Sequence, residues 1–232
     1  MSSRRLPGKV LQPVLDRPMI VRQLERVALA SVDAVVVATS TDSSDDPLVD
    51  AVEQAGVACY RGPLDDVLAR MFAAATAHEA RHVVRLTADC PLIDYRVIDA
   101  VVERHVETCS DYTSNTLERT YPDGQDVEVV TLAALERAHR DARTPAEREH
   151  VTPYIYGHPE WFVLCSTTGP VNASHLRWTV DYAEDLEVVR RIFAEFADRP
   201  ASFSMEEILA LYERYPRLHS INAKMNPAAS TE

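Results

Sequence analysis

A glycine turn flanked by cationic side chains stands at the start of the sequence. In RLPGK (residues 5–9), Gly8 allows backbone N–H groups to approach an anion, and Arg5 and Lys9 can neutralise its charge. Lys9 and Lys224 are the only lysines, which favours a compact ammonium charge at this position over the planar fork of arginine. The turn lacks the second spaced glycine and the Gly-Lys-Ser/Thr ending of a Walker loop. It is therefore either a phosphate-binding loop or an ordinary surface turn.

Two aspartates end apolar segments that each contain an arginine. Arg85 lies inside VVRLT, where an unpaired charge would be costly, so it must meet a carboxylate or a ligand; Asp89 follows in a tight turn. Arg177 and Asp181 repeat this arrangement in LRWTVD. Magnesium often takes one or two protein carboxylates together with substrate phosphates, so this pair of aspartates would suffice to bind it.

Each aspartate also has a structural explanation. Asp89 can be a loop cap, and Asp181 with Glu184 can form a capping box at the start of a helix. For Asp181 the structural and the functional interpretations are equally weighted.

Polar side chains in the second half of the sequence suit the recognition of sugar hydroxyls, although a solvated loop has the same composition. His150 has no serine or cysteine nucleophile at a telling spacing, so we predict no catalytic triad. The histidines are not clustered as zinc ligands are. The candidate residues are Asn115, Asp123, Glu128, Glu149 and His150.

Composition limits the classes of function. The chain has 232 residues, 46% of them hydrophobic, and no apolar run near the roughly 18 to 20 residues that span a bilayer. A net charge of −12 argues against broad binding to nucleic acid or to anionic membranes. The four cysteines are scattered, which indicates reduced thiols and a cytoplasmic protein. A local basic cluster at the start still allows a small anionic ligand.

Strands and helices are expected to alternate through the first half of the chain. Continuous apolar strands alternating with helices indicate an α/β fold, with a mostly parallel sheet covered by helices on both faces. In such a sheet ligands bind beyond the carboxyl ends of the strands. Strands are expected at 33–40, 57–62, 82–87, 125–131, 161–168 and 175–181, and helices at 45–56, 63–80, 95–108, 133–142, 145–158, 182–196 and 204–215.

Seven segments together resemble the CMP-sugar cytidylyltransferases, closest to the branch of spore coat polysaccharide biosynthesis proteins and akin to acylneuraminate and CMP-KDO synthetases. The match covers nearly the whole chain in order. The segments are SSRRLPGKVL, VVVATSTDSSDDPLV, YRGPLDDVLAR, VVRLTADCPLID, DYTSNTLERTYPDGQDVEV, EREHVTPYIY and LRWTVDYAEDLEVV.

The resemblance implies a fold of the nucleotide-diphospho-sugar transferase type. It implies one nucleotidyltransferase domain over 1–226, with a sugar-facing segment at about 111–175. The residues that follow the last expected helix predict a disordered tail at 227–232. The implied reaction joins CTP and an acidic or modified sugar into a CMP-sugar and pyrophosphate, with Mg²⁺ and for surface polysaccharide synthesis. Relatives of this kind suggest a homodimer.

The resemblance also implies roles for individual residues. Arg5 and Lys9 would be catalytic residues that hold the triphosphate, and Asp89 and Asp181 would hold the metal. Gly8, Thr39, Asp65 and Arg85 would lie near the nucleotide, and the polar residues from Asn115 to His150 named above would face the sugar.

Family members begin with an apolar strand that runs into the glycine turn, whereas this sequence begins at Met1 inside the turn. We expect the natural start to lie upstream, because the remaining motifs are intact. The alternatives are a nucleotidylyltransferase for a sugar 1-phosphate or a phosphonate, a non-catalytic nucleotide-binding module, and a glycosyltransferase of related fold that releases no pyrophosphate.

Overall fold

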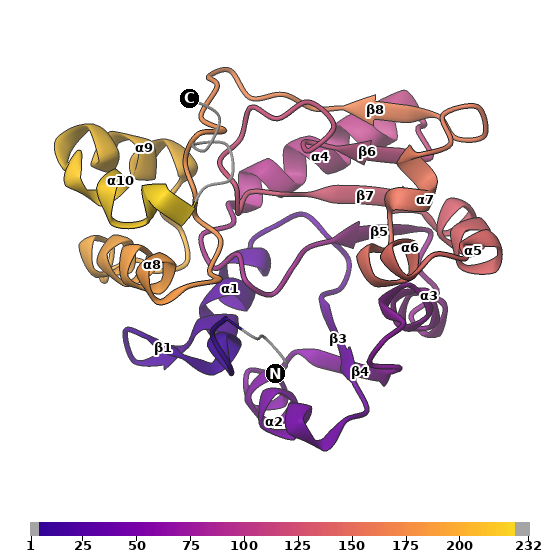
Figure 1. Cartoon of the computed structure of the whole chain (residues 1–232), viewed down its shortest axis with the longest axis horizontal. Coiled ribbons are helices and arrows are strands. Elements are labelled where there is room, and N and C mark those ends of the chain that lie inside the picture. The colour runs from indigo at the N-terminus through magenta and orange to yellow at the C-terminus, as the bar shows by residue number, and fades with distance from the viewer. Residues whose placement is uncertain (1–4, 226–232) are drawn as a thin grey trace.

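The strands form three hydrogen-bonded groups, two of which make up the centre of the molecule (Figure 1). The computed structural model describes residues 5–225, so the tail predicted at 227–232 lies outside the described residues. The groups are β1-β2, β3-β4 and β5-β7-β6-β8. The strands are β1 (Pro13–Val14), β2 (Arg17–Pro18), β3 (Val36–Ser40), β4 (Ala58–Gly62), β5 (His82–Arg85), β6 (Tyr112–Ser114), β7 (Glu128–Thr131) and β8 (Leu164–Ser166).

Strand directions are mixed within this α/β architecture. β3 is parallel to β4, and β6 is parallel to β8, but β7 is antiparallel to both β5 and β6. The reason is the connection from β6 to β7, residues 115–127, which contains no helix and returns the chain along its neighbour. Parallel neighbours instead need a crossover, usually a helix. Among the described residues β3 and β5 are not hydrogen-bonded to each other.

Helices cover both faces of the four-stranded group, as the sequence predicts. Val129 of β7 packs in one apolar cluster with residues of α4, and its neighbour Val130 packs in another with residues of α3, α5 and α7. Successive strand residues point to opposite faces, so each face has its own core. The α/β class is confirmed. The helices that take part are α3 (Val67–Ala77), α4 (Tyr95–Thr108), α5 (Leu132–Asp141) and α7 (Pro153–Tyr156).

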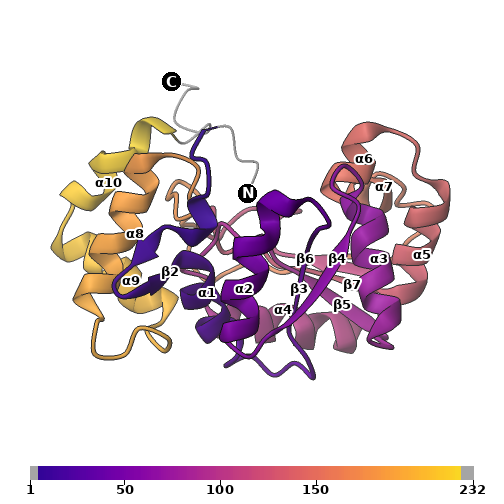
Figure 2. The same ribbon diagram turned by 90° about the horizontal axis from the view of Figure 1, so that it is seen from below.

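Two groups of helices lie on opposite sides of the molecule, with α1 and α2 between them. In Figure 2, α8, α9 and α10 lie on one side of the molecule, and α3, α5, α6 and α7 lie on the other. The remaining helices are α1 (Met19–Val27), α2 (Asp46–Gln54), α6 (Pro145–His150), α8 (Ala183–Glu195), α9 (Met205–Arg214) and α10 (Arg217–Asn222), with short 3-10 turns η1 (Lys9–Leu11), η2 (Ser43–Asp45) and η3 (Ala223–Met225).

Two expected elements are wrong in detail. The expected strand at 175–181 makes only one isolated bridge, between Arg177 and Asp123, and is otherwise turn, bend and irregular backbone. The expected helix at 145–158 divides into α6 and α7. The division falls at Val151, whose φ of 74° lies outside the helical region and ends α6, whereas Pro153 is the first residue of α7, a position that needs no N–H donor. None of the helices described over 5–225 is long and apolar enough to cross a membrane.

Candidate active site

The ammonium of Lys9 lies between two aspartates from distant parts of the chain. Its Nζ donates to Asp89 Oδ2 at 2.8 Å, to Asp181 Oδ1 at 3.0 Å and to the carbonyl oxygen of Val180 at 2.8 Å. Gly8 precedes η1 and has a φ of 68°, which is a left-handed conformation that favours glycine. The glycine turn therefore delivers Lys9 to both aspartates, and we call these three residues the Lys9 cluster.

Backbone contacts hold the two aspartates side by side. The N–H of Val180 donates to the carbonyl oxygen of Asp89 at 2.8 Å, and the Thr179 hydroxyl donates to the same oxygen at 3.4 Å. Asp89 lies in the loop after β5, and Asp181 lies two residues before the start of α8. These contacts link the two segments independently of the side chains that would contact a ligand.

The side chain of Asp181 does not cap α8. Asp185, rather than Glu184, accepts hydrogen bonds from the backbone N–H groups of Asp181 and Tyr182, at 2.9 and 3.0 Å. The expected Asp181–Glu184 capping box is therefore wrong. The Asp181 carboxylate contacts cations instead: Lys9, Arg177 at 2.8 Å and the exposed Arg5 at 2.8 Å.

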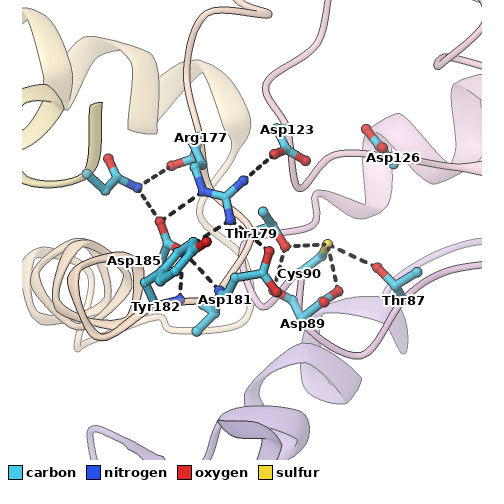
Figure 3. Close-up of polar contacts among 12 residues, drawn as sticks. Thr87, Asp89, Cys90, Asp123, Asp126, Arg177, Thr179, Asp181, Tyr182 and Asp185 are labelled. Atoms are coloured by element: carbon cyan, nitrogen blue, oxygen red, sulfur yellow. Dashed lines mark hydrogen bonds and ion pairs between the residues drawn. The ribbon is translucent and has the colours of Figure 1, made fainter. Parts of the chain in front are cut away.

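A buried arginine connects the aspartates of the site (Figure 3). Arg177 donates to Asp123 Oδ2 and Asp181 Oδ2, each at 2.8 Å, and to both carboxylate oxygens of Asp185 at 3.1 and 3.2 Å. Asn222 donates to the Arg177 carbonyl and to Asp185 at 2.9 Å. Three carboxylates around one guanidinium give a fixed acidic wall beside the Lys9 cluster.

The turn that contains Asp123 approaches the segment that contains Arg177 so closely that it requires a glycine. Gly124 has a φ of 107°, and a Cβ there would lie 2.6 Å from the backbone nitrogen of Thr179 and 2.7 Å from the carbonyl carbon of Trp178. No larger residue fits at that distance without moving the backbone. The neighbouring Asp123 carbonyl accepts hydrogen bonds from the N–H groups of Trp178 and Thr179. The turn therefore packs directly on the segment that contains Arg177.

Opposite charges favour the ionised forms of Lys9 and Asp181. Burial would lower the pKa of Lys9, but the charges and hydrogen bonds of Asp89 and Asp181 outweigh it, so the pKa is raised. Burial would raise the pKa of Asp181, but Lys9 and Arg177 outweigh it, so that pKa is lowered. For Asp123, burial and the nearby Asp126 outweigh the opposing effect of Arg177, and the pKa is raised.

The two aspartates of the Lys9 cluster fit a divalent cation that also binds phosphates. Within residues 5–225 no group of three or more His, Cys, Asp or Glu side chains is placed to hold a metal ion. Asp89 and Asp181 nevertheless direct carboxylate oxygens at one cationic centre, the ammonium of Lys9. Two carboxylates with substrate phosphates are a common set of ligands for Mg²⁺.

The residues expected near the nucleotide are not all free to contact a ligand. Thr39 is buried and donates to Asp45 Oδ2 at 2.7 Å. Asp65 is exposed in the turn between β4 and α3, and its neighbour Asp66 both caps α3 and pairs with Arg148.

Among the residues expected at the sugar, Asn115 is buried and bonded to backbone. Its amide donates to the Gln125 carbonyl at 2.6 Å and accepts from the Val127 N–H at 2.8 Å. Glu149 and His150 are exposed at the end of α6.

The remaining expected residues line one pocket. A pocket of about 220 Å³ is lined by Arg85, Glu128 and His150, and also by Thr87, which precedes the Asp89 turn. Arg85 was expected to meet either a carboxylate or a ligand. It lies opposite Glu128 in the β5-β7 ladder and forms an ion pair with it, so it meets a carboxylate.

Sequence reasoning missed the importance of Arg177 and Asp185. The available signal was the spacing of Arg177, Asp181 and Asp185 at every fourth residue, with the last in the first turn of α8. The ion pair between Arg119 and Asp126 beside the pocket was also missed. No local pattern distinguishes it from a solvated loop.

Comparisons with known proteins identify the family of this chain. A family model described as cytidylyltransferase matches residues 1–214. The spore coat polysaccharide biosynthesis protein SpsF of Bacillus subtilis is 30% identical over 223 residues, covering 93% of this chain and 92% of that protein. The structure of a cytidylyltransferase from Leptospira borgpetersenii has a TM-score of 0.90 and 31% identity, covering 94% of this chain and 92% of that one.

A more distant structure agrees in fold. CMP:2-keto-3-deoxy-manno-octonic acid synthetase complexed with CTP has a TM-score of 0.60 and 18% identity, covering 84% of this chain and 95% of that one. The predicted nucleotide-diphospho-sugar transferase fold and the predicted resemblance are both confirmed. Because the family model spans the glycine turn and both aspartates of the Lys9 cluster, the chain belongs to the cytidylyltransferase family.

Proposed function

We propose that this chain transfers a cytidylyl group from CTP to an acidic or otherwise modified sugar, giving a CMP-sugar and pyrophosphate for surface polysaccharide synthesis. Membership of the cytidylyltransferase family and the similarity to SpsF support this proposal. The observation that carries it is the convergence of Lys9, Asp89 and Asp181 at one point. Nucleotidyl transfer requires charge neutralisation and in-line positioning more than a covalent nucleophile.

In the proposed reaction an oxygen of the sugar attacks the α-phosphorus of CTP. The new P–O bond forms as the bond to the bridging oxygen breaks, pyrophosphate leaves, and the proton of the attacking hydroxyl passes to water. Lys9 and Arg5 lie on the glycine turn and would neutralise the charge that develops on the leaving group. Gly8 would let the backbone of the turn approach the phosphates.

We propose that the enzyme depends on Mg²⁺ held by Asp89 and Asp181. Such an ion, when bound, neutralises phosphate charge and orients the triphosphate. The chain's own contribution is to keep the Asp181 carboxylate ionised through Lys9 and Arg177, and to hold the two aspartates adjacent through the Val180–Asp89 backbone hydrogen bond. We further propose that the protein works in the cytoplasm as a homodimer, and that residues 111–175 face the sugar.

Pyrophosphate release tests the proposal. The protein is incubated with Mg²⁺, one nucleoside triphosphate and a panel of acidic and modified sugars, and pyrophosphate is measured. We expect release with CTP and at least one sugar, and much less with ATP or GTP. If no sugar causes pyrophosphate release from CTP, the proposal is wrong. Turnover of a finished CMP-sugar without pyrophosphate would indicate a glycosyltransferase instead.

A further inference from the structure

The guanidinium of Arg5 lies over an aromatic ring as well as beside a carboxylate. Its central carbon is 5.0 Å from the centroid of the Tyr182 ring, and Arg5 Nη1 is 3.5 Å from the Tyr182 hydroxyl oxygen. Arg5 Nη2 pairs with Asp181 Oδ1 at 2.8 Å. Figure 3 shows Tyr182 beside Asp181 and Asp185. The arginine proposed to hold the triphosphate therefore has two partners of different kinds.

The two sides of the contact between Arg5 and Tyr182 differ in how firmly they are held. Tyr182 stands at the start of α8, where its N–H donates to Asp185 Oδ2 at 3.0 Å and its carbonyl oxygen accepts from the Leu186 N–H at 3.2 Å. Arg5 has a side chain that is 53% exposed, and ordering such a long side chain costs conformational entropy. The ring is thus the fixed surface, and the arginine is the group that it orders.

The two partners of Arg5 differ in what happens to them when a ligand binds. Asp181, the carboxylate partner, is one of the two residues proposed to hold Mg²⁺, so it would exchange Arg5 for the metal ion. The Tyr182 ring stays available, because it attracts the guanidinium through its π-electrons rather than through a carboxylate. A guanidinium has five N–H donors. Arg5 can therefore remain over the ring while it donates to phosphate oxygens.

We infer that Tyr182 is a positioning residue, which holds Arg5 at the triphosphate site. This inference rests on the proposed function and assigns a role to a residue that the sequence motifs left without one. Tyr182 acts through Arg5: the ring orders the guanidinium before the nucleotide binds, so less conformational freedom is lost when the phosphate contacts form. The consequence is tighter binding of the triphosphate and of pyrophosphate, with no effect on binding of the sugar.

Isothermal titration calorimetry tests the inference without turnover. CTP and, separately, inorganic pyrophosphate are titrated into the protein in the presence of Mg²⁺. Y182L removes the ring, and we expect each ligand to bind about fivefold more weakly, equal to about 1 kcal/mol. Y182M also lacks a ring and should give the same loss, whereas Y182F keeps the ring and should bind within about twofold of the wild type.

Three results of this titration would overturn the inference. Unchanged binding in Y182L and Y182M would show that the ring does not contribute. Tighter binding would show that the ring holds Arg5 away from the ligand. A loss in Y182F as large as that in Y182L would place the effect at the hydroxyl rather than at the ring. Failure of the wild type to bind either ligand would also overturn it.

A double-mutant cycle tests whether Tyr182 acts through Arg5. R5M removes the guanidinium, so Y182L should weaken CTP binding about fivefold in the wild-type background and should have no effect in the R5M background. A fivefold loss that persists in the R5M background would show that the ring contacts the ligand directly or supports the fold. That result would overturn the inference.

Y215L is the matched control for the removal of an aromatic ring. Arg214 lies over the Tyr215 ring, with its central carbon 4.9 Å from the centroid, at the end of α9. Removing this ring should leave the affinity for CTP unchanged, and urea denaturation shows whether both leucine variants remain folded. An equal loss of affinity in Y215L would contradict a specific role for Tyr182.

Pyrophosphate release from CTP separates this inference from the proposed function. In turnover, Y182L should raise the KM for CTP about fivefold and leave the KM for the sugar within about twofold. Release of pyrophosphate with an unchanged KM for CTP in Y182L would uphold the function and overturn the inference. No release with any sugar, together with the expected binding losses and the expected cycle, would overturn the function and leave the role of Tyr182 standing.

Discussion

Lys9 and Asp181 are 172 residues apart in the sequence, yet the Lys9 ammonium donates to the Asp181 carboxylate at 3.0 Å. The same ammonium contacts Asp89 at 2.8 Å. Without a ligand, an internal cation therefore occupies the position between the two carboxylates that we propose to hold Mg²⁺. A divalent ion must displace Lys9, which is then available to the triphosphate.

Replacing Lys9 should strengthen metal binding in the absence of nucleotide. K9M removes the competing cation, and we expect Mn²⁺, measured by electron paramagnetic resonance, to bind about tenfold more tightly. Turnover should fall about 100-fold, because the charge beside the leaving group is lost. K224M changes the only other lysine, which is exposed, and is the control. Weaker or unchanged Mn²⁺ binding in K9M would show that Lys9 does not compete for this position.

The two aspartates of the Lys9 cluster should be needed for turnover rather than for folding. We expect D89N and D181N each to lower kcat about 100-fold or more, with small changes in the free energy of unfolding measured in urea. E184Q is the control, because Glu184 is exposed and is not the residue that accepts the backbone N–H groups at the start of α8. A non-catalytic nucleotide-binding module would show no turnover in the wild type, and therefore none for D89N to lower. A loss of stability in E184Q would indicate that Asp181 and Glu184 form a capping box after all.

Arg177 should be essential for stability. R177M leaves Asp185, which is 1% exposed, as a buried charge without its main partner. Breaking a buried ion pair by removing one partner costs about 3–5 kcal/mol of unfolding free energy. R191M is the control: it disrupts the exposed Arg191–Glu187 pair on α8, the helix that contains Asp185, and should cost about 0.5 kcal/mol or less of unfolding free energy. Urea denaturation compares the two, and equal effects would contradict the proposed role of Arg177 in holding the acidic wall.

Thr39 provides a test of a residue expected near the nucleotide. Its hydroxyl donates to the Asp45 carboxylate at 2.7 Å inside the protein. T39V removes a hydrogen bond to a charged group, which costs about 1.5–3 kcal/mol of stability. We expect the KM for CTP to remain within about twofold, because about 0.4 kcal/mol is within the range of indirect effects. A large rise in KM with unchanged stability would instead place Thr39 at the nucleotide.

Glu207 should make stability depend on acid. Hydrogen bonds from Arg199 and the Ser204 N–H lower its pKa from 4.5 to about 2. Because the pKa of Glu207 is lower in the folded state than in the unfolded state, its stabilisation is complete above pH 4.5 and is lost as the pH falls toward 2. The difference in urea midpoint between wild type and E207Q should therefore be constant above 4.5 and shrink below it. A difference that grows with acid would contradict this assignment.

The residue types that could do chemistry, and the alternation of strands and helices, could be predicted from the sequence. Glycine at residue 8, β-branched apolar runs and helical periodicity are local features, and local backbone preferences respond to them directly. The expected helix at 145–158 failed at Val151, whose φ of 74° ends α6; a β-branched residue rarely adopts that conformation, and no local pattern in the sequence indicates it. The expected strand at 175–181 failed because a ladder needs a partner strand, which local sequence does not specify.

A cationic glycine turn and two aspartates that follow apolar segments, in a cytidylyltransferase-like order, could be identified from the sequence alone. Only the tertiary structure decided which charges meet. Arg85 was expected to meet a carboxylate or a ligand, and the fold supplies Glu128 as the carboxylate; Asp185 rather than Glu184 receives the N–H groups at the start of α8. The physical reason is that an ion pair depends on distances of a few ångströms between segments that are far apart in the chain, and those distances are set by packing.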